Sequence, residues 1–164
     1  MTYKTSLDNL AKVVTIVITI LFAAIIVGQF PLIKDEGKSL PIFTTILLSF
    51  IYFGTFSFRP INYKLTDDSL IIHRPLLDIK INRTEIKSVE QLDKAKLSWA
   101  VRIFGVGGLF GYWGKFRNKK LGSMTWYATR RNNAVLVTTI YNKKIVLTPN
   151  EPEKFVTEFN GQTI

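Results

Sequence analysis

Two long runs of uncharged residues dominate the first third of this 164-residue chain. Residues 13–30 read VVTIVITILFAAIIVGQF and residues 40–58 read LPIFTTILLSFIYFGTFSF, and neither run contains Asp, Glu, Lys, Arg or His. As helices rising about 1.5 Å per residue, they would each reach about 27 Å, close to the ~30 Å thickness of a bilayer's hydrocarbon core. The sequence therefore predicts two transmembrane α-helices.

A cleavable signal peptide is the alternative for the first run, since Lys4 and Lys12 give it a positively charged front. Its apolar stretch is longer than the usual run of about 7 to 15 residues, no A-x-A site follows it, and the second run begins soon after. We therefore expect the first run to be retained as a helix. The chain has no cysteine, which excludes a lipoprotein anchor, disulfides, thiolate catalysis and cysteine-bound metals.

The connector between the runs, residues 31–39, is too short to hold a domain, so we expect an antiparallel helical hairpin with both chain ends on one side of the membrane. Neither run contains an ionisable group for transport or proton relay, so we interpret the hairpin as an anchor. The small residues Ala24 and Gly28, four apart, predict close packing between its two helices. We assign residues 1–60 to the hairpin and residues 61–164 to a second domain.

Charge favours a cytoplasmic position for both chain ends. Lys and Arg flank the hairpin at Lys4, Lys12, Arg59 and Lys64, and the connector contributes Lys34 and Lys38. Because the positive-inside rule counts Lys and Arg, this bias predicts that the flanks and the second domain are cytoplasmic. Residues after 58 carry 18 of the 22 Lys and Arg but only 9 of the 12 Asp and Glu. Such a domain is attracted to an anionic leaflet by about 1 kcal/mol for each cation held near the surface.

After residue 61 the pattern changes to short stretches with period-two alternation, which predict about seven antiparallel strands. INYKL and SLIIHR flank the turn-rich residues 66–69 and predict a hairpin, LDIKI and IKSVEQL follow, and AVLVTTI and KIVLT predict a further hairpin after GSMTWYATR. Asn150 is predicted to cap a final helix, with Pro152 in its first turn and Glu153 at its third position. Its apolar face would consist of Phe155, Val156 and Phe159.

The segment FGVGGLFGYWGKFRNKKLG, residues 104–122, is followed by YATRRNNAVLVTT and KKIVLTPNEPEKFV, and together they resemble the bacterial pleckstrin-homology (PH) domain family. The resemblance covers residues 61–159 and is to members whose PH-like domain follows a transmembrane hairpin. It implies a mainly-β barrel of two roughly orthogonal antiparallel sheets capped by a C-terminal α-helix, in a protein of the bacterial inner membrane. The family has no known catalytic residues, and the resemblance implies little about a ligand.

The glycine-rich segment, residues 104–122, fits neither of the phosphate-binding motifs. A G-x-G-x-x-G pattern beginning at Gly105 would need glycine where Phe110 stands, and a P-loop around Gly114 and Lys115 would need glycine where Leu109 stands. Its alternating aromatic and basic residues would suit single-stranded nucleic acid. In a β segment, however, half of the rings would point into the core, so we expect no nucleic-acid partner. We interpret the glycines as positions of positive φ or close approach in a bulged loop.

Basic side chains in and after this segment are the candidate binding residues: Lys115, Arg117, Lys119, Lys120, Arg130 and Arg131. They predict a surface for an acidic protein segment or for anionic lipid headgroups. Asp67 and Asp68 occupy the first hairpin turn, where phosphoinositide-binding PH domains carry cations, so specific headgroup recognition is not expected. The lone His73 and the acidic turn suggest no catalytic centre, and no metal-ligand spacing is present.

We therefore predict a non-enzymatic membrane-anchored module with no cofactor. Its partner is predicted to be a protein, or a second copy of the chain, bound through an exposed strand edge, the C-terminal helix face or the spans. A basic-loop sensor of anionic lipid is the alternative. A third hypothesis is an unrecognised enzyme, which would require a deep polar pocket.

Overall fold

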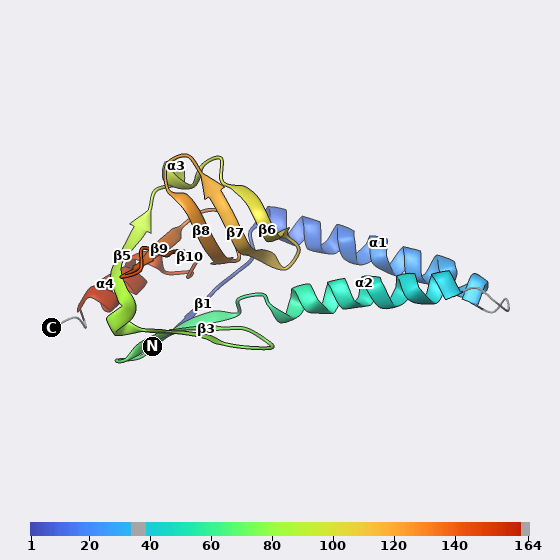
Figure 1. The fold of residues 1–164 in the computed structure, drawn as a ribbon, viewed down its shortest axis with the longest axis horizontal. Helices are drawn as coiled ribbons and strands as arrows, with labels where there is room; N and C mark the ends of the chain where they lie inside the picture. The colour runs from blue at the N-terminus through green and yellow to red at the C-terminus, as the bar shows by residue number, and fades with distance from the viewer. Residues whose placement is uncertain (34–38, 162–164) are drawn as a thin grey trace.

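The computed structural model describes residues 1–33 and 39–161 and contains two long helices that project together from one end of a β-rich domain (Figure 1). Helix α1 is Asn9–Ile33 and helix α2 is Ser39–Ser57. The domain has a four-stranded and a six-stranded sheet and ends in helix α4, Pro152–Gly161. The predicted fold class, two apolar helices followed by a mainly-β domain with a C-terminal helix, is confirmed.

The four-stranded sheet is antiparallel throughout, in the order β1-β2-β3-β4. Its strands are β1 (Thr2–Lys4), β2 (Asn62–Leu65), β3 (Ser69–His73) and β4 (Ile79–Asn82). Strands β2 and β3 form the predicted hairpin, whose turn is closed by a 2.9 Å hydrogen bond from the Thr66 N–H to the Ser69 carbonyl. Asp67 and Asp68 occupy this turn, because short acidic side chains favour turn geometry.

Strand β1 comes from the segment that precedes the helices. It pairs antiparallel with β2, and the N-terminal amine of Met1 donates to the Leu65 carbonyl at 2.5 Å. The buried Tyr3 ring meets Phe155 of α4 edge-on, with 5.0 Å between ring centroids. The chain before α1 and the chain after α2 therefore belong to one folded unit, and the helix ends that adjoin it lie on the same side.

The six-stranded sheet has the order β5-β9-β10-β8-β7-β6, and only the β8–β10 pair is parallel. Its strands are β5 (Ile86–Leu92), β6 (Val101–Gly108), β7 (Gly111–Asn118), β8 (Gly122–Ala128), β9 (Ala134–Thr139) and β10 (Lys144–Leu147). Strands β9 and β10 form the second predicted hairpin. Between β4 and β5 lies a short 3₁₀ helix, Arg83–Glu85, and α3 (Lys94–Leu97) lies between β5 and β6.

The predicted number of strands, about seven, is too low. Within the described residues nine strands follow α2, and β1 adds a tenth. The difference arises because the glycine-rich segment, predicted to be a bulged loop, supplies most of β6 and β7. Glycine weakens intrinsic strand preference, so a glycine-rich run is predicted as a loop even where close strand pairing requires it.

Two apolar clusters form the core, and alternate residues of β9 enter each. Val135 and Val137 belong to the cluster that contains residues of both sheets and of α4, whereas Leu136 belongs to the second. In the second cluster Phe116 of β7 stacks on Trp126 of β8, with ring centroids 4.5 Å apart. Both faces of β9 are consequently buried, so its sequence reads as a continuous apolar run.

Helix α4 begins one residue later than predicted. The carbonyl of Glu151 accepts the first helical hydrogen bond, which makes Glu151 the N-cap residue. Asn150, predicted as the cap, instead accepts a 2.9 Å hydrogen bond from the Ser6 hydroxyl. The predicted apolar face is confirmed, since Phe155 and Phe159 are buried in the core.

Helix α1 extends beyond the predicted span at both ends. Asp8 caps it by accepting a 2.8 Å hydrogen bond from the Ala11 N–H. At its other end the helix continues through Pro31 to Ile33, into the predicted connector, of which residues 34–38 lie outside the described residues. The most apolar 18 residues within Asn9–Gln29 and within Leu40–Ser57 have mean hydropathies of 2.8 and 1.6, so both helices are long and apolar enough to cross a membrane.

The two helices contact each other through side chains other than the small pair. The Thr19 hydroxyl lies 3.0 Å from the Tyr52 hydroxyl, and the Phe22 and Tyr52 rings are 6.3 Å apart. Ala24 and Gly28, predicted to bring the helices together, are exposed, and no atom lies within 4 Å of the position that a Cβ on Gly28 would take. That prediction is wrong, because helical phase turns these two residues away from α2.

Candidate binding surface

Strands β6 and β7 form a hairpin whose turn lies between the bases of the two long helices. The Phe110 ring in this turn meets Tyr52 and Phe56 of α2 edge-on, at centroid distances of 5.1 and 5.4 Å. From α1, the Thr15 hydroxyl accepts a 2.9 Å hydrogen bond from the Phe110 N–H. The glycine-rich segment thus joins the β domain to the helical hairpin.

Paired glycines allow these two strands to approach closely. Gly105 and Gly114 lie opposite each other and have φ values of +102° and +120°. A Cβ on Gly105 would lie 2.2 Å from the Trp113 carbonyl oxygen, and a Cβ on Gly114 would lie 2.3 Å from that of Phe104. The predicted role of these glycines, positive φ with close approach, is confirmed. They lie in the paired strands β6 and β7, however, and not in a loop.

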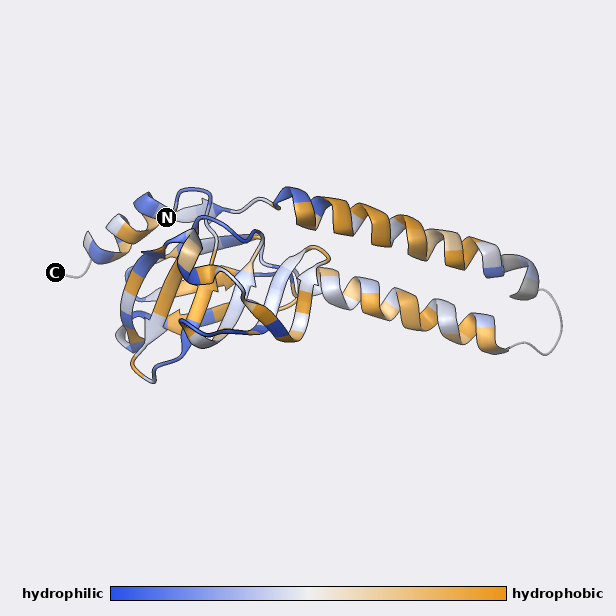
Figure 2. Cartoon of the chain, turned by 90° about the horizontal axis from the view of Figure 1, so that it is seen from above, coloured by the Kyte–Doolittle hydropathy of each residue, from blue (hydrophilic) through white to orange (hydrophobic). Residues whose placement is uncertain are grey.

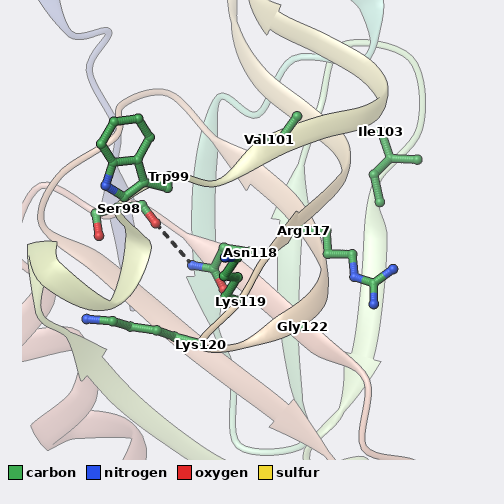
Figure 3. Close-up of a pocket in the computed structure, with 9 residues that line it drawn as sticks. All are labelled: Ser98, Trp99, Val101, Ile103, Arg117, Asn118, Lys119, Lys120 and Gly122. Atoms are coloured by element: carbon green, nitrogen blue, oxygen red, sulfur yellow. Dashed lines mark hydrogen bonds between the residues drawn. The ribbon is translucent and has the colours of Figure 1, made fainter.

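An open groove of about 1020 Å³ runs along the outer part of this hairpin (Figure 3). Its lining residues come from the segment after α3, from β6, and from the end of β7, the turn that follows it and the start of β8: Ser98, Trp99, Val101, Ile103, Arg117, Asn118, Lys119, Lys120 and Gly122. Strand β6 is the outermost strand of its sheet, and no strand of the described residues pairs with its outer edge. The groove therefore adjoins an edge without a strand partner, although the Gly108 end of this edge meets Thr15 of α1.

One side of the groove is apolar and exposed to solvent. Trp99 is 92 % exposed and has a φ of +60°, a conformation that bulky residues rarely adopt. Val101 and Ile103 of β6 are 67 % and 61 % exposed. Adjacent exposed apolar side chains of this size are typical of interaction sites.

The other side of the groove is basic. Arg117 projects from β7, and Lys119 and Lys120 follow in the turn (Figure 3). The turn is held against α3, because Asn118 donates to the Lys96 carbonyl at 2.7 Å and the Lys120 ammonium donates to the Ala95 carbonyl at 3.1 Å. These two hydrogen bonds fix the position of the turn backbone that carries Lys119 and Lys120.

Only three of the six predicted binding residues, Arg117, Lys119 and Lys120, lie together in this groove. Lys115 lines a separate cleft of about 350 Å³ that both sheets border, and its ammonium donates to the Thr125 hydroxyl at 2.9 Å. Arg130 and Arg131 follow β8 at the opposite end of the hairpin, since the β7–β8 register pairs Tyr112 with Ala128 and Asn118 with Gly122.

Arg130 and Arg131 belong to the junction with α1. The Arg131 N–H donates to the Asp8 carboxylate at 3.1 Å, and its guanidinium lies 5.2 Å from the centre of the Tyr112 ring. Arg130 donates to the Thr148 carbonyl at 3.4 Å, and burial lowers the pKa of its guanidinium. Burial, and secondly the nearby Asp8, raise the pKa of Tyr112, so its hydroxyl stays protonated and donates to that carboxylate.

A family model described as Bacterial PH domain matches residues 61–163, more than half of the chain. The chain belongs to this family. The comparisons with curated proteins and with solved structures returned no match.

The first hairpin of this PH domain, β2–β3, is acidic at its turn. Asp67 and Asp68 are both exposed there. In the described part of the chain, no group of three or more His, Cys, Asp or Glu side chains is placed to hold a metal ion. His73, the lone histidine, lies half-exposed, and its Nδ1 is 2.7 Å from the Asp78 carboxylate.

Sequence reasoning missed the apolar half of the groove. Trp99, Val101 and Ile103 alternate with other residues in the manner of a half-buried strand, which is the pattern of a core as well as of an exposed edge. What distinguishes the two is the place of β6 at the end of the sheet order, and no local pattern encodes that order.

Proposed function

We propose that this protein is anchored in a bacterial cytoplasmic membrane by α1 and α2, and that its PH domain binds a protein segment on the cytoplasmic side without catalysis. Anchoring is supported by the surface of the helices. Hydrophobic residues predominate along both of them (Figure 2), and almost no residue of their apolar segments is buried by the rest of the protein. Water is a poor solvent for such a surface, whereas the bilayer interior suits it.

The cytoplasmic orientation is supported by charge and by connectivity. Strand β1 and the PH domain adjoin the same ends of the helices, where Lys4, Lys12, Arg59 and Lys64 outnumber the cations of the connector. The positive-inside rule places the side with more Lys and Arg in the cytoplasm. A fluorescent reporter fused after residue 164 should therefore fluoresce, and an alkaline phosphatase fused there should be inactive.

The open edge of β6 is the observation that carries the binding proposal. It combines a backbone edge that no described strand pairs with, exposed apolar side chains and a row of cations beside one groove of about 1020 Å³. An extended peptide added to a sheet edge gains main-chain hydrogen bonds, and pockets beside the edge select its side chains. The groove suits a segment that has apolar residues opposite Trp99, Val101 and Ile103 and carboxylates opposite Arg117 and Lys119.

A lipid headgroup is a poorer fit for the same cations. Lys119 and Lys120 lie at the far end of β7 from Phe110, which marks the helix bases, and an eight-residue strand extends roughly 25 Å. Strand β7 runs obliquely away from the helices (Figure 1). Attraction between exposed charges is screened beyond roughly 10 Å at ordinary salt, so this end of the groove is better placed for a partner than for the leaflet.

Site-specific photocrosslinking in host cells tests the binding proposal. The photoreactive residue p-benzoylphenylalanine replaces Ile103 in the full chain, and Tyr141, an exposed residue of the β9–β10 turn, provides the matched control. We expect a discrete protein adduct from position 103 and none from position 141. Changing Arg117, Lys119 and Lys120 together to Gln should reduce that adduct several-fold.

The molecular weight of the adduct separates the candidate partners. A product of twice the mass of the chain would identify a second copy, and a heavier or lighter product would identify another protein by mass spectrometry. Equal labelling at positions 103 and 141, or crosslinks to lipid alone, would contradict a protein-binding groove. Release of the chain by alkaline carbonate would contradict anchoring independently.

A further inference from the structure

A second exposed apolar feature lies at the opposite side of the domain from the groove, in the turn between β3 and β4. Leu76 and Leu77 are 58 % and 62 % exposed. The Leu76 N–H donates to the carbonyl of Ser57, the last residue of α2, at 3.1 Å. Figure 1 shows the β3–β4 hairpin reaching toward the base of α2. The two leucines are therefore held at the level where α2 ends.

The depth of this turn follows from the length of α2, provided that α1 and α2 span the bilayer as proposed above. Residues 40–57 form 18 residues of apolar helix, about 27 Å long, which nearly fills a ~30 Å hydrocarbon layer. Ser57 then lies at the boundary between the acyl chains and the headgroups. The turn bonded to Ser57 lies at the same boundary.

Several backbone polar groups at the tip of the turn are already bonded or absent. Pro75 has no N–H, the Leu76 N–H is bonded to Ser57, and the Leu77 carbonyl accepts a 2.7 Å hydrogen bond from Arg74 Nε. Backbone groups without a partner are costly to remove from water. Satisfied groups of this kind lower the cost of placing the tip in an apolar surrounding.

The turn is also fixed in shape and flanked by a cation. The Asp78 carboxylate accepts hydrogen bonds from the Arg74 N–H, at 3.1 Å, and from His73 Nδ1, at 2.7 Å. The hydrogen bond from His73, and secondly that from Arg74, hold the pKa of Asp78 below its ordinary value, so this acceptor is charged at neutral pH. The Arg74 guanidinium lies 5.4 Å from the centre of the Phe58 ring, beside the end of α2. A cation there suits lipid phosphates.

We propose that the β3–β4 turn inserts Leu76 and Leu77 into the headgroup–acyl boundary of the leaflet from which α2 emerges, and so seats the PH domain on the membrane surface. The other end of strand β3 supports this assignment. The β2–β3 turn carries exposed Asp67 and Asp68, which an anionic leaflet repels. The apolar turn is thus at the membrane end of β3 and the acidic turn is at its far end.

Single-cysteine labelling in bilayers tests this inference. The natural chain has no cysteine, so Leu76→Cys, Leu77→Cys and, as the matched control, Asp67→Cys each create one attachment site in the full-length protein. Each variant carries a nitroxide and is reconstituted in vesicles of phosphatidylcholine with a quarter phosphatidylglycerol. Collision rates with oxygen, which concentrates in lipid, and with a water-soluble nickel chelate report the depth of the label.

We expect the ratio of oxygen to nickel collisions to be several-fold higher at positions 76 and 77 than at position 67. Nickel access at all three positions as high as at a water-exposed site would overturn the inference, provided that the chain still resists alkaline carbonate. Release by carbonate would instead overturn the anchoring proposal on which the inference depends. Labels at 76 and 77 that are shielded from nickel but show no gain in oxygen collisions would identify a protein cover and would also overturn it.

Discussion

Substitution of Gly105 by alanine should destabilise the domain strongly, and the same change at Gly114, which lies opposite, should do so to a similar extent. The new Cβ would lie 2.2 Å from the Trp113 carbonyl oxygen and 2.8 Å from the Gly114 Cα, both backbone atoms that cannot rotate away. The φ of +102° adds conformational strain of about 1–3 kcal/mol for a residue with a side chain. Relief of the overlap requires β6 and β7 to separate, at the loss of about 1 kcal/mol for each ladder hydrogen bond broken.

These contributions give a loss of at least about 3 kcal/mol in the free energy of unfolding, against a usual total of about 5–15 kcal/mol for a domain. For a domain of about 100 residues, each 1 kcal/mol lowers Tm by about 4–8 °C, so Gly105→Ala should lower Tm by roughly 12–24 °C. The assay is thermal unfolding of the full chain in detergent micelles. It is followed by near-ultraviolet circular dichroism of the core tryptophan Trp126, which stacks on Phe116.

Two other glycines serve as matched controls for strain and for space. Gly122 has a φ of +73° but no atom within 4 Å of its virtual Cβ, so Gly122→Ala isolates the conformational cost, about 1–2 kcal/mol. Gly107 has no positive φ, and the nearest atom to its virtual Cβ belongs to the flexible Arg102 side chain at 3.5 Å. Gly107→Ala should change stability by no more than about 0.5–1 kcal/mol. Equal Tm values for the Gly105 and Gly107 variants would refute the close-approach reasoning.

Three further predictions concern the contacts that join the domain to its helices and close its turns. Phe110→Ala removes the ring that meets Tyr52 and should lower stability by about 3–5 kcal/mol, measured by the same thermal assay. Tyr3→Phe removes the hydrogen bond to Glu158 but keeps the ring in the core, so it should cost only about 1 kcal/mol, whereas Tyr3→Ala should cost several-fold more in urea unfolding. Asp78 has a lowered pKa in the folded state, so its contribution is complete above its ordinary pKa of about 3.9 and is lost as pH falls through the lowered value. Asp78→Ala should therefore lower Tm at pH 7 and have little effect well below pH 3, and a constant difference across this range would contradict the assignment.

Features set by local chemistry could be predicted from the sequence. The helices follow from uncharged runs of bilayer length, and the β2–β3 and β9–β10 hairpins follow from turn residues between alternating stretches. Strand β1 could not be predicted in the same way. Three residues form no recognisable period, and their partner strand lies about 60 positions later in the chain. Only the return of the chain from the helical hairpin brings the two segments together.

The candidate binding surface likewise could not be predicted from local sequence alone. Proximity in sequence suggested that Lys115 to Lys120 share a surface with Arg130 and Arg131. Strand β8 reverses the chain direction between the two groups, so they lie at opposite ends of one pair of strands. Alternation along β7 places Lys115 and Arg117 on one face and buries Phe116 on the other. A charge cluster in sequence therefore becomes a surface cluster only when the strand register is known.

The contacts at the helix bases have a consequence for recognition. Strand β1 leads into α1, Phe110 packs against α2, and the Leu76 N–H is bonded to Ser57, so three separate attachments hold the domain at one orientation to the helices. A domain on a single flexible linker would sample many orientations, whereas this one presents the β6 edge in one direction. Under the anchoring proposed above, a partner attached to the same membrane would meet this edge in one orientation, and attachment of both molecules to one surface would raise their effective concentration. Moderate affinity for an acidic and apolar segment would then suffice for binding.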